Sequence, residues 1–234
     1  LPAPHELSSR RIVQATKIYD RTGGVLLYEI HGEEKRTIIP FAEIPAAVKN
    51  ATIAIEDANF YRHAGIDLKG ILRALVADIV TRDFRQGGST ITQQLVKNSL
   101  LGHERTISRK IREALYAMAL EARLPKEQIL DLYLNQIPYG SNAYGIEAAA
   151  QTYFGKRAHT LSAREASVLA ALPVAPTYFS PYGQQKDELI RRADHILLRM
   201  EKLGYLTPAE AAAARTEPLK FLPAAKNIRA PHFV

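Results

Sequence analysis

The chain has 234 residues, of which 47% are hydrophobic and 24% are charged, a composition typical of a globular protein rather than a disordered one. This length can hold one large domain or two small lobes that share a core. The formal net charge of +7 suits nucleic acid, an anionic membrane or a phosphorylated substrate, without choosing between them. The absence of cysteine excludes disulfides and thiolate metal sites, and no apolar run reaches the roughly 18 residues of a membrane-spanning segment.

The predicted elements fall into three parts. Residues 1–45 are expected to form an N-terminal linker and a β-hairpin, because two β-prone runs, Ile12 to Tyr19 and Val25 to Ile30, flank a stretch of turn-forming residues. Residues 46–217 are expected to form one mainly α-helical domain. In residues 218–234 prolines recur without any periodic pattern, which predicts an irregular linker.

The segment from Glu56 to Gly65 is the first candidate for chemistry. Apolar residues at helical spacing lead up to it, so the adjacent acids Glu56 and Asp57 are expected at the C-terminal end of a helix. The helix dipole disfavours carboxylates at that end, and such a local conflict indicates a functional role. His63 follows in the same segment, although a single histidine is more often a structural hydrogen-bonding residue than a catalyst.

Two further helices are predicted before residue 100. The segment from Asp67 to Arg82 has a wide apolar face, which we expect to be buried in the core rather than to touch a bilayer. A glycine pair precedes the second helix, for which Ser89 is the expected N-cap. On that helix Thr90, Gln94 and Lys97 are expected to form one polar stripe.

The second half of the chain is expected to be mostly helical and largely structural. In a helix from Thr106 to Arg123, the apolar residues expected to be buried are Ile107, Ile111, Leu115 and Met118. Another helix is expected from Pro125 to Asn135, and a long one from Gln184 to Leu203 ends before a glycine. Capping boxes begin at Ser162 and at Thr207.

Two groups of charged residues are candidates for chemistry. The basic group, which could line a phosphate-sized pocket, consists of Lys97, Arg105, Arg109, Lys110 and Arg112. The alternative is a solvated basic face, but the hydroxyl and amide side chains nearby favour a binding site. Glu56 and Glu113 could divide general-base and electrostatic roles in glycosyl transfer if they meet across a cleft, and are surface charges otherwise. Neither a nucleophile-elbow motif nor a zinc-binding motif is present.

Five short motifs follow one another between residues 56 and 200. They are Glu56-Asp57-x-x-Phe60-x-x-His63-x-Gly65, Gly87-x-Ser89-Thr90-Ile91-Thr92-Gln93-Gln94 with Lys97 and Asn98, Arg109-Lys110-x-x-Glu113, Lys126-x-x-Ile129-Leu130-x-x-Tyr133-Leu134-Asn135, and Arg192-x-x-x-Ile196-Leu197-x-x-Met200. In this order they resemble the motifs of the peptidoglycan glycosyltransferase domain of class A penicillin-binding proteins (glycosyltransferase family 51). In the fifth motif Ile196 stands where valine is common, which is a conservative difference.

The resemblance implies a mainly α-helical, lysozyme-like bilobal fold with a membrane-facing apolar surface. The segment from Asp67 to Phe84 is the candidate for part of that surface, so the resemblance favours the bilayer alternative more than the apolar pattern alone does. It implies an inverting enzyme that polymerises lipid II into β-1,4-linked glycan strands, using a growing strand on undecaprenyl pyrophosphate as the donor and the 4-hydroxyl of lipid II as the acceptor. By similarity, Glu56 is the general base and Glu113 the second catalytic acid. The residues that the resemblance implies in substrate binding are Asp57, His63, Ser89, Thr90, Gln94, Lys97, Arg105, Arg109, Lys110 and Asn135.

The resemblance also implies a setting and partners. It places the site at the extracytoplasmic face of the cytoplasmic membrane, with lipid II, the glycan strand and moenomycin-type inhibitors as ligands and no nucleic acid. A divalent cation, Mg²⁺ or Mn²⁺, at Glu113 or at the pyrophosphate is left open. The chain starts at Leu1 without a membrane helix, and Arg229 to Val234 resembles the start of a linker to a transpeptidase domain. We therefore expect a domain excised from a bifunctional protein, with a monofunctional transglycosylase as the alternative.

Two functions of other classes compete with this one. A lysozyme-like hydrolase would also use an acidic pair in a helical fold, but it has no need of the basic group, which counts against it. A helical nucleic-acid binder would use the positive charge, but charge alone is weak support for that class.

Overall fold

A computed structural model describes residues 16–19, 26–30, 35–68, 70, 88–101 and 106–224. The helices are α2 (Ala46–Glu56), α4 (Ile91–Leu100), α5 (Ile107–Glu121), α6 (Lys126–Gln136), α7 (Ile146–Phe154), α8 (Ala163–Ala171), α9 (Lys186–Lys202) and α10 (Pro208–Thr216). The strands are β1 (Thr16–Tyr19), β2 (Leu26–Ile30), β3 (Lys35–Arg36), β4 (Pro138–Gly140) and β5 (Ala143–Tyr144). The mainly helical fold class is thereby confirmed.

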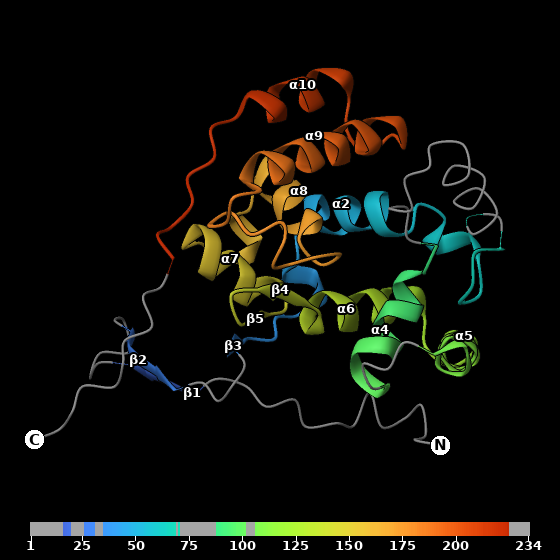
Figure 1. Ribbon diagram of the computed structural model, residues 1–234. Helices are drawn as coiled ribbons and strands as arrows, with labels where there is room; N and C mark the ends of the chain where they lie inside the picture. The colour runs from blue at the N-terminus through green and yellow to red at the C-terminus, as the bar shows by residue number, and fades with distance from the viewer. Residues whose placement is uncertain are drawn as a thin grey trace, which may run out of the picture.

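The helices form two packed groups, shown in Figure 1. Helices α2, α8, α9 and α10 lie together in the upper part of the view, and α4, α5 and α6 lie together below them. Helix α7 contacts both α6 and α8 and so connects the two groups. The site described below draws its residues from both groups, so its geometry depends on how they pack.

The predicted N-terminal hairpin is confirmed for its strands. Strands β1 and β2 pair antiparallel, with Thr16 opposite Ile30, and the turn between them lies outside the described residues. A second sheet, which the sequence did not predict, has the order β3–β5–β4. The turn between β4 and β5 holds Ser141 and Asn142 at φ values of 48° and 62°, as a type I′ hairpin turn requires. This sheet ties the segment before α2 to the segment after α6.

Helix α2 determines where Glu56 lies. It begins after Pro45, whose extended backbone precedes the first turn, and it ends where Asp57 adopts φ −158° and ψ 76°. Its buried side chains are Val48, Ala51, Thr52, Ile53 and Ala54. Because these side chains pack against α8 and α9, Glu56 sits at the C-terminal end of a firmly anchored helix, as predicted.

Helix α4 begins one residue later than predicted. The N-cap is Thr90 and not Ser89, since Thr90 Oγ1 accepts the Gln93 N–H at 3.1 Å and Gln93 Oε1 accepts the Thr90 N–H at 2.9 Å. This reciprocal capping box satisfies two backbone N–H groups and leaves the Ser89 hydroxyl for another partner. Ile91 and Leu95 face inward, as predicted.

The buried face of α5 differs from the prediction. The four residues expected to be buried are exposed instead, Ile107 to 83%; the others are Ile111, Leu115 and Met118. The side chains that face inward are Glu113, Ala117 and Leu120. The prediction was wrong because it considered apolar residues alone, whereas a carboxylate can be buried when neighbouring cations neutralise it, as Glu113 is.

The remaining predictions agree with the structure where it describes them. Helix α6 follows Pro125, α9 ends just before Gly204, and the capping boxes at Ser162 and Thr207 both form. Only the start of the helix predicted from Asp67 to Arg82 lies in the described residues. The domain boundaries and the two lobes stay predictions. Within the described ranges, no helix is both long and apolar enough to cross a membrane.

Candidate active site

The carboxylate of Glu56 is held by side chains of neighbouring helices. Its Oε2 accepts a hydrogen bond from Gln94 Nε2 at 2.6 Å, and Gln94 Oε1 accepts one from the Tyr133 hydroxyl at 3.1 Å. The bond from Tyr133 fixes the orientation of the Gln94 amide, so that the amide N–H group faces Glu56. The other oxygen, Glu56 Oε1, is buried and accepts no hydrogen bond from the described residues. This oxygen therefore has an acceptor site that the described residues do not use.

Opposing influences act on the ionisation of Glu56. Burial raises the pKa of Glu56 above its ordinary value of 4.5, because loss of water disfavours the carboxylate. The hydrogen bond from Gln94 and the charges of Arg192 and Lys97 lower this pKa, and the adjacent Asp57 raises it. A carboxyl group whose pKa is raised toward neutrality is well matched to the task of a general base.

Arg192, on α9, is a residue of this site that sequence reasoning missed. Its charge influences the pKa of Glu56, and Glu56 influences the pKa of Arg192 in return. Arg192 opens the fifth motif, but the sequence did not indicate that α9 packs against α2. Tyr133, in the fourth motif, was missed because the sequence did not indicate that α6 packs against α4.

Glu113 lies in a different environment, at the first turns of α5. The residue is 1% exposed, and both its carboxylate oxygens are paired: Arg109 Nη1 lies 3.2 Å from Oε2, and Lys110 Nζ contacts Oε1. Lys110 Nζ also donates to Ser89 Oγ at 2.6 Å. These contacts use two of the three N–H donors of an ammonium group, and Lys110 is 47% exposed. We call Ser89, Arg109, Lys110 and Glu113 the Lys110 cluster.

A buried chain of hydrogen bonds joins the first motif to the start of α4. Asp57 accepts from His63 Nε2 at 2.9 Å and from the Ile91 backbone N–H at 3.1 Å. His63 Nδ1 accepts the Gly65 N–H at 3.2 Å, while its Nε2 is the ring nitrogen that faces Asp57. The Gly65 carbonyl accepts from Thr90 Oγ1 at 2.7 Å. The chain thus fixes the start of α4 against the end of α2.

Gly65 allows this close approach. Its φ of 94° lies in the region that favours glycine, and a Cβ there would lie 2.8 Å from backbone atoms of Ala117 and Met118 on α5. Any side chain at this position would push α5 away from the first motif. This close approach to α5 explains why the first motif ends in a glycine.

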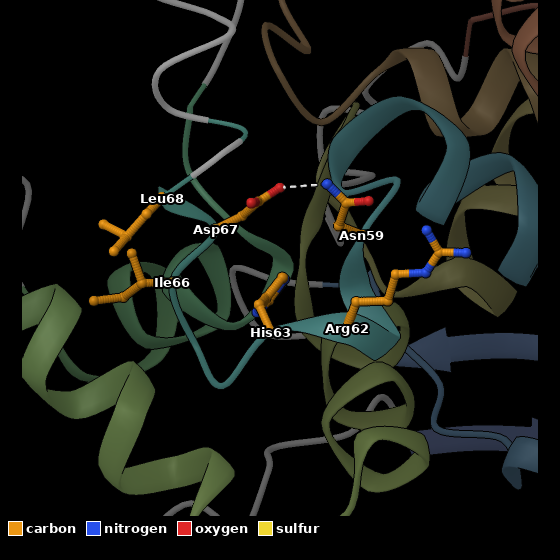
Figure 2. Close-up of a pocket in the computed structure, with 6 residues that line it drawn as sticks. All are labelled: Asn59, Arg62, His63, Ile66, Asp67 and Leu68. Atoms are coloured by element: carbon orange, nitrogen blue, oxygen red, sulfur yellow. Dashed lines mark hydrogen bonds between the residues drawn. The ribbon is translucent and has the colours of Figure 1, made fainter.

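A cavity of about 330 Å³ opens beside His63. Its walls, drawn in Figure 2, are Asn59, Arg62, His63, Ile66, Asp67 and Leu68. Asn59 Nδ2 donates to Asp67 Oδ2 at 2.8 Å across it, whereas the side chain of Arg62 points away from the other five. Ile66 and Leu68 lie together on the opposite side from Arg62. The cavity therefore combines polar and apolar walls and borders the buried hydrogen-bond chain.

Three other predicted residues are Arg105, Asn135 and Arg112. Arg105 lies outside the described residues. The amide of Asn135 is fully used inside the protein: its Oδ1 accepts the Ile39 N–H, and its Nδ2 donates to the Ile39 carbonyl and to Asp131, all within 3.1 Å. Arg112, on α5, is exposed.

The donor set does not fit a metal ion at Glu113. Both carboxylate oxygens are engaged by cationic side chains, which would repel a divalent cation. Over the part of the chain that the structure describes, no group of three or more His, Asp or Glu side chains is placed to hold a metal ion. A divalent cation at the substrate pyrophosphate, the other place considered for a metal, stays a prediction.

Comparison with known proteins decides the family. The model of the family described as Transglycosylase matches residues 23–201, a range that includes Glu56, the Lys110 cluster and Arg192. The chain belongs to the transglycosylase family. The resemblance indicated by the five motifs, to the peptidoglycan glycosyltransferase domain of class A penicillin-binding proteins, is confirmed.

The similarity to known relatives covers most of this chain but only about a quarter to a third of each relative. Penicillin-binding protein 1A of Aquifex aeolicus is 47% identical over 219 residues, and that of Escherichia coli is 41% identical over 217 residues. The alignments cover 94% and 93% of this chain but 30% and 25% of those proteins. A crystal structure of penicillin-binding protein 1A from Haemophilus influenzae aligns with a TM-score of 0.50 and 25% identity, over 91% of this chain and 22% of that one.

Proposed function

We propose that this chain polymerises lipid II into β-1,4-linked glycan strands, with a growing strand on undecaprenyl pyrophosphate as the donor. The proposal is carried by the unpaired, buried Oε1 of Glu56 in the same fold as the cationic Lys110 cluster. Glycosyl transfer from a pyrophosphate needs a base for the acceptor hydroxyl and positive charge for the leaving group. The transglycosylase family supports the same reaction.

Glu56 acts as the general base in this proposal. Its Oε1 takes the proton of the acceptor 4-hydroxyl while that hydroxyl oxygen forms a bond to the anomeric carbon of the donor. Gln94 binds the other carboxylate oxygen and so orients Oε1. Attack in line with the leaving group inverts the α-linked donor to a β-1,4 product, and no covalent enzyme intermediate forms.

The Lys110 cluster receives the leaving group. As the new bond forms, the bond between the anomeric carbon and the pyrophosphate oxygen breaks, and its electron pair leaves with undecaprenyl pyrophosphate. The remaining N–H donor of Lys110 and the guanidinium of Arg109 neutralise the phosphate charge, so the leaving group needs no strong acid. Glu113 keeps both cations oriented toward the donor and supports positive charge on the donor sugar. Lys97 and Arg105 are further cations proposed for the pyrophosphate.

The other predicted binding residues act by holding the site in place. The polar groups of Asp57 and His63 are used within the buried chain, and Thr90 caps α4 while it binds Gly65. Asn135 is similarly occupied by backbone groups and Asp131. We assign these residues to the orientation of Glu56 and α4 rather than to direct contact with the sugar.

The setting of the reaction follows from its substrate. Lipid II carries an undecaprenyl chain, so the site must work at a membrane surface, and we propose the extracytoplasmic face of the cytoplasmic membrane. Relatives named penicillin-binding proteins extend well beyond the aligned region. We propose a transpeptidase domain in the full-length protein, and moenomycin-type inhibitors as ligands of the donor site.

A product assay with labelled lipid II tests this function against its closest rival, a lysozyme-like hydrolase. The expected products are glycan strands of many disaccharides together with undecaprenyl pyrophosphate, separated on a gel and by lipid extraction. Cleavage of preformed glycan without strand growth would overturn the proposal in favour of the hydrolase. Moenomycin is expected to block strand growth and serves as the specificity control.

A further inference from the structure

Glu121, the last residue of α5, is a buried acid that the proposed mechanism does not use. It lies in the helix group of α4, α5 and α6, in the lower part of Figure 1. Its side chain is 4% exposed. A helix dipole disfavours a carboxylate at the C-terminal end, and burial removes the water that would solvate its charge. The position of Glu121 therefore requires an explanation.

Glu121 binds α4 through Thr92. The Thr92 hydroxyl donates to Glu121 Oε1 at 2.5 Å, a charge-assisted hydrogen bond. Thr92 is fully buried, so water does not compete for this hydroxyl. Gln94, whose amide binds Glu56, lies two residues farther along the same helix. The bond from Thr92 therefore fixes the part of α4 that carries Gln94.

Glu121 also binds α6, through Lys126. Lys126 Nζ lies 2.7 Å from Glu121 Oε2, as an ion pair without the alignment of a hydrogen bond, and 4.4 Å from the centre of the Phe60 ring. Lys126 is the first residue of α6. Tyr133, farther along that helix, donates to Gln94 Oε1. One carboxylate thus contacts both helices that supply the Gln94–Tyr133 pair.

A third contact connects Glu121 to the segment after α2. His63 Nδ1 lies 3.9 Å from Glu121 Oε1, and the other ring nitrogen faces Asp57. Asp57 accepts the backbone N–H of Ile91, and Glu121 accepts the hydroxyl of Thr92. Two buried acids therefore hold the first two residues of α4, and His63 lies between these acids.

We propose that Glu121 is a positioning residue that holds α4 against α6, so that Gln94 and Tyr133 orient the Glu56 carboxylate. The proposal rests on the proposed function, in which Glu56 is the general base. Gln94 Nε2 lies 2.6 Å from Glu56 Oε2, so a shift of α4 by about 1 Å would lengthen this contact beyond hydrogen-bond range. Glu121 acts through this contact and does not touch the reacting atoms.

The direct test observes the side-chain amide of Gln94 without substrate. Glutamine labelled with ¹⁵N at the side chain is incorporated, and the Gln94 signal is identified as the one missing from Gln94→Met. Thr92→Val keeps the branched shape but removes the hydroxyl. Exchange of the Gln94 amide protons with water should accelerate about tenfold, since a hydrogen bond to a charged group contributes about that factor or more to a local equilibrium. Thr92→Ser keeps the hydroxyl and should stay close to the parent.

Thr216 provides a matched control on α10. It is exposed, and its hydroxyl donates to the Ala213 carbonyl at 2.9 Å. Thr216→Val should leave the Gln94 signal unchanged. In Glu121→Gln the amide cannot pair with Lys126 as the carboxylate does, so Gln94 exchange should accelerate there too.

Several outcomes would overturn the proposal. One is an unchanged Gln94 signal in either Thr92→Val or Glu121→Gln. Another is an equal acceleration of the backbone amides of α9, which would show a general loss of stability. If Thr92→Val and Glu121→Gln both fail to fold while Thr92→Ser folds, the contact serves the fold itself, and the positioning role is also wrong.

Polymerisation kinetics supply a second readout. In Thr92→Val, kcat should fall about tenfold with KM for lipid II unchanged, because the charge-assisted contact between Gln94 and Glu56 is weakened. The acid limb of the kcat profile should move to higher pH, since the Gln94 hydrogen bond lowers the pKa of Glu56. A raised KM with unchanged kcat would contradict the positioning role. If Glu56→Gln polymerises lipid II normally, the proposed function fails, and the amide exchange still decides whether Glu121 positions Gln94.

Discussion

The two acidic regions of the molecule, around Glu56 and around Glu113, contrast in how their charge is balanced. Glu113 is 1% exposed, and cations contact both of its oxygens. Glu56 has one oxygen bound to a neutral amide and one with no donor among the described residues, and its cations act without a direct hydrogen bond. The two acids therefore cannot exchange roles.

This difference teaches which acid can move a proton. A carboxylate that is bound on both oxygens by cations holds its charge firmly and serves as a fixed electrostatic element. A carboxylate that burial destabilises and that has one oxygen without a protein donor is the more basic of the two. The contrast assigns proton transfer to Glu56 and charge placement to Glu113, and the following predictions test that division.

The largest expected effect is on catalysis by Glu56→Gln. The amide keeps the shape of the side chain and can still accept from Gln94, but it cannot take a proton. Because general acid–base catalysis contributes about 10²–10⁴-fold, kcat should fall by about that factor in the lipid II assay. Glu127→Gln, at an exposed position on α6, is the control and should retain full activity. Near-normal turnover in Glu56→Gln would remove Glu56 as the base.

The same substitution at the two acids should change stability in opposite directions. Burial raises the folded-state pKa of Glu56 above 4.5, so folding favours its protonated form, and the stability that Glu56 contributes below pH 4.5 is lost as the pH rises through the folded pKa. Glu56→Gln should therefore melt a few degrees higher than the parent at pH 8, and at about the same temperature near pH 4. Equal melting temperatures at pH 8 would contradict burial as the dominant influence.

Glu113→Gln is expected to destabilise the protein at neutral pH. It removes a buried charge that pairs with Arg109 and Lys110. Breaking a buried ion pair costs about 3–5 kcal/mol, and the partial exposure of Lys110 should reduce this to about 2 kcal/mol. Urea unfolding of Glu56→Gln and Glu113→Gln in parallel gives the comparison. If Glu113→Gln is more stable than the parent, the proposed difference between the Glu56 and Glu113 regions is wrong.

Sequence reasoning reached the Glu113 region better than the Glu56 region for a physical reason. Arg109, Lys110 and Glu113 are neighbours within one helix, so the spacing alone brings them together. The partners of Glu56 come from other helices, and a cation such as Arg192 is placed by packing that no local pattern encodes. The end of α2 could be predicted from apolar spacing, but its surroundings could not.

The exposed face of α5 illustrates the same limit. Apolar spacing predicted a buried stripe through Ile111 and Leu115, yet the cations beside Glu113 permit the opposite rotation of the helix. The N-cap of α4 was predicted one residue too early, at Ser89 instead of Thr90. Both residues can cap a helix, and only the reciprocal hydrogen bonds with Gln93 distinguish them.

Removal of the Lys110 charge should weaken the stabilisation of the pyrophosphate leaving group. Lys110→Met keeps the aliphatic length but removes the cation that binds Glu113 and Ser89. We expect kcat/KM for lipid II to fall about 10–100-fold, in keeping with the loss of one charge-assisted contact worth about 1.5–3 kcal/mol. The acid limb of the pH profile should not move, because Glu56 is untouched. A shifted acid limb would show that the two regions are not independent.

Two further variants serve as controls for Lys110→Met: Lys110→Arg and Arg123→Met. Arginine keeps the charge but changes the geometry, so activity should be restored in part. Arg123 is exposed just beyond the end of α5, and its replacement should leave kcat/KM unchanged. Unchanged kinetics in Lys110→Met would place Lys110 outside the donor site.

The smallest expected effect is at Tyr133, which orients Gln94 on the Glu56 side. Tyr133→Phe removes the hydroxyl that donates to Gln94 Oε1 and leaves that amide free to turn over. A turned amide would present its oxygen to Glu56, so the variant should lose about 1 kcal/mol of stability and a few-fold in kcat. Tyr116→Phe, which removes a buried hydroxyl without a partner among the described residues, should lose neither. Equal losses in the two variants would mean that the Gln94 contact contributes nothing to the orientation of Glu56.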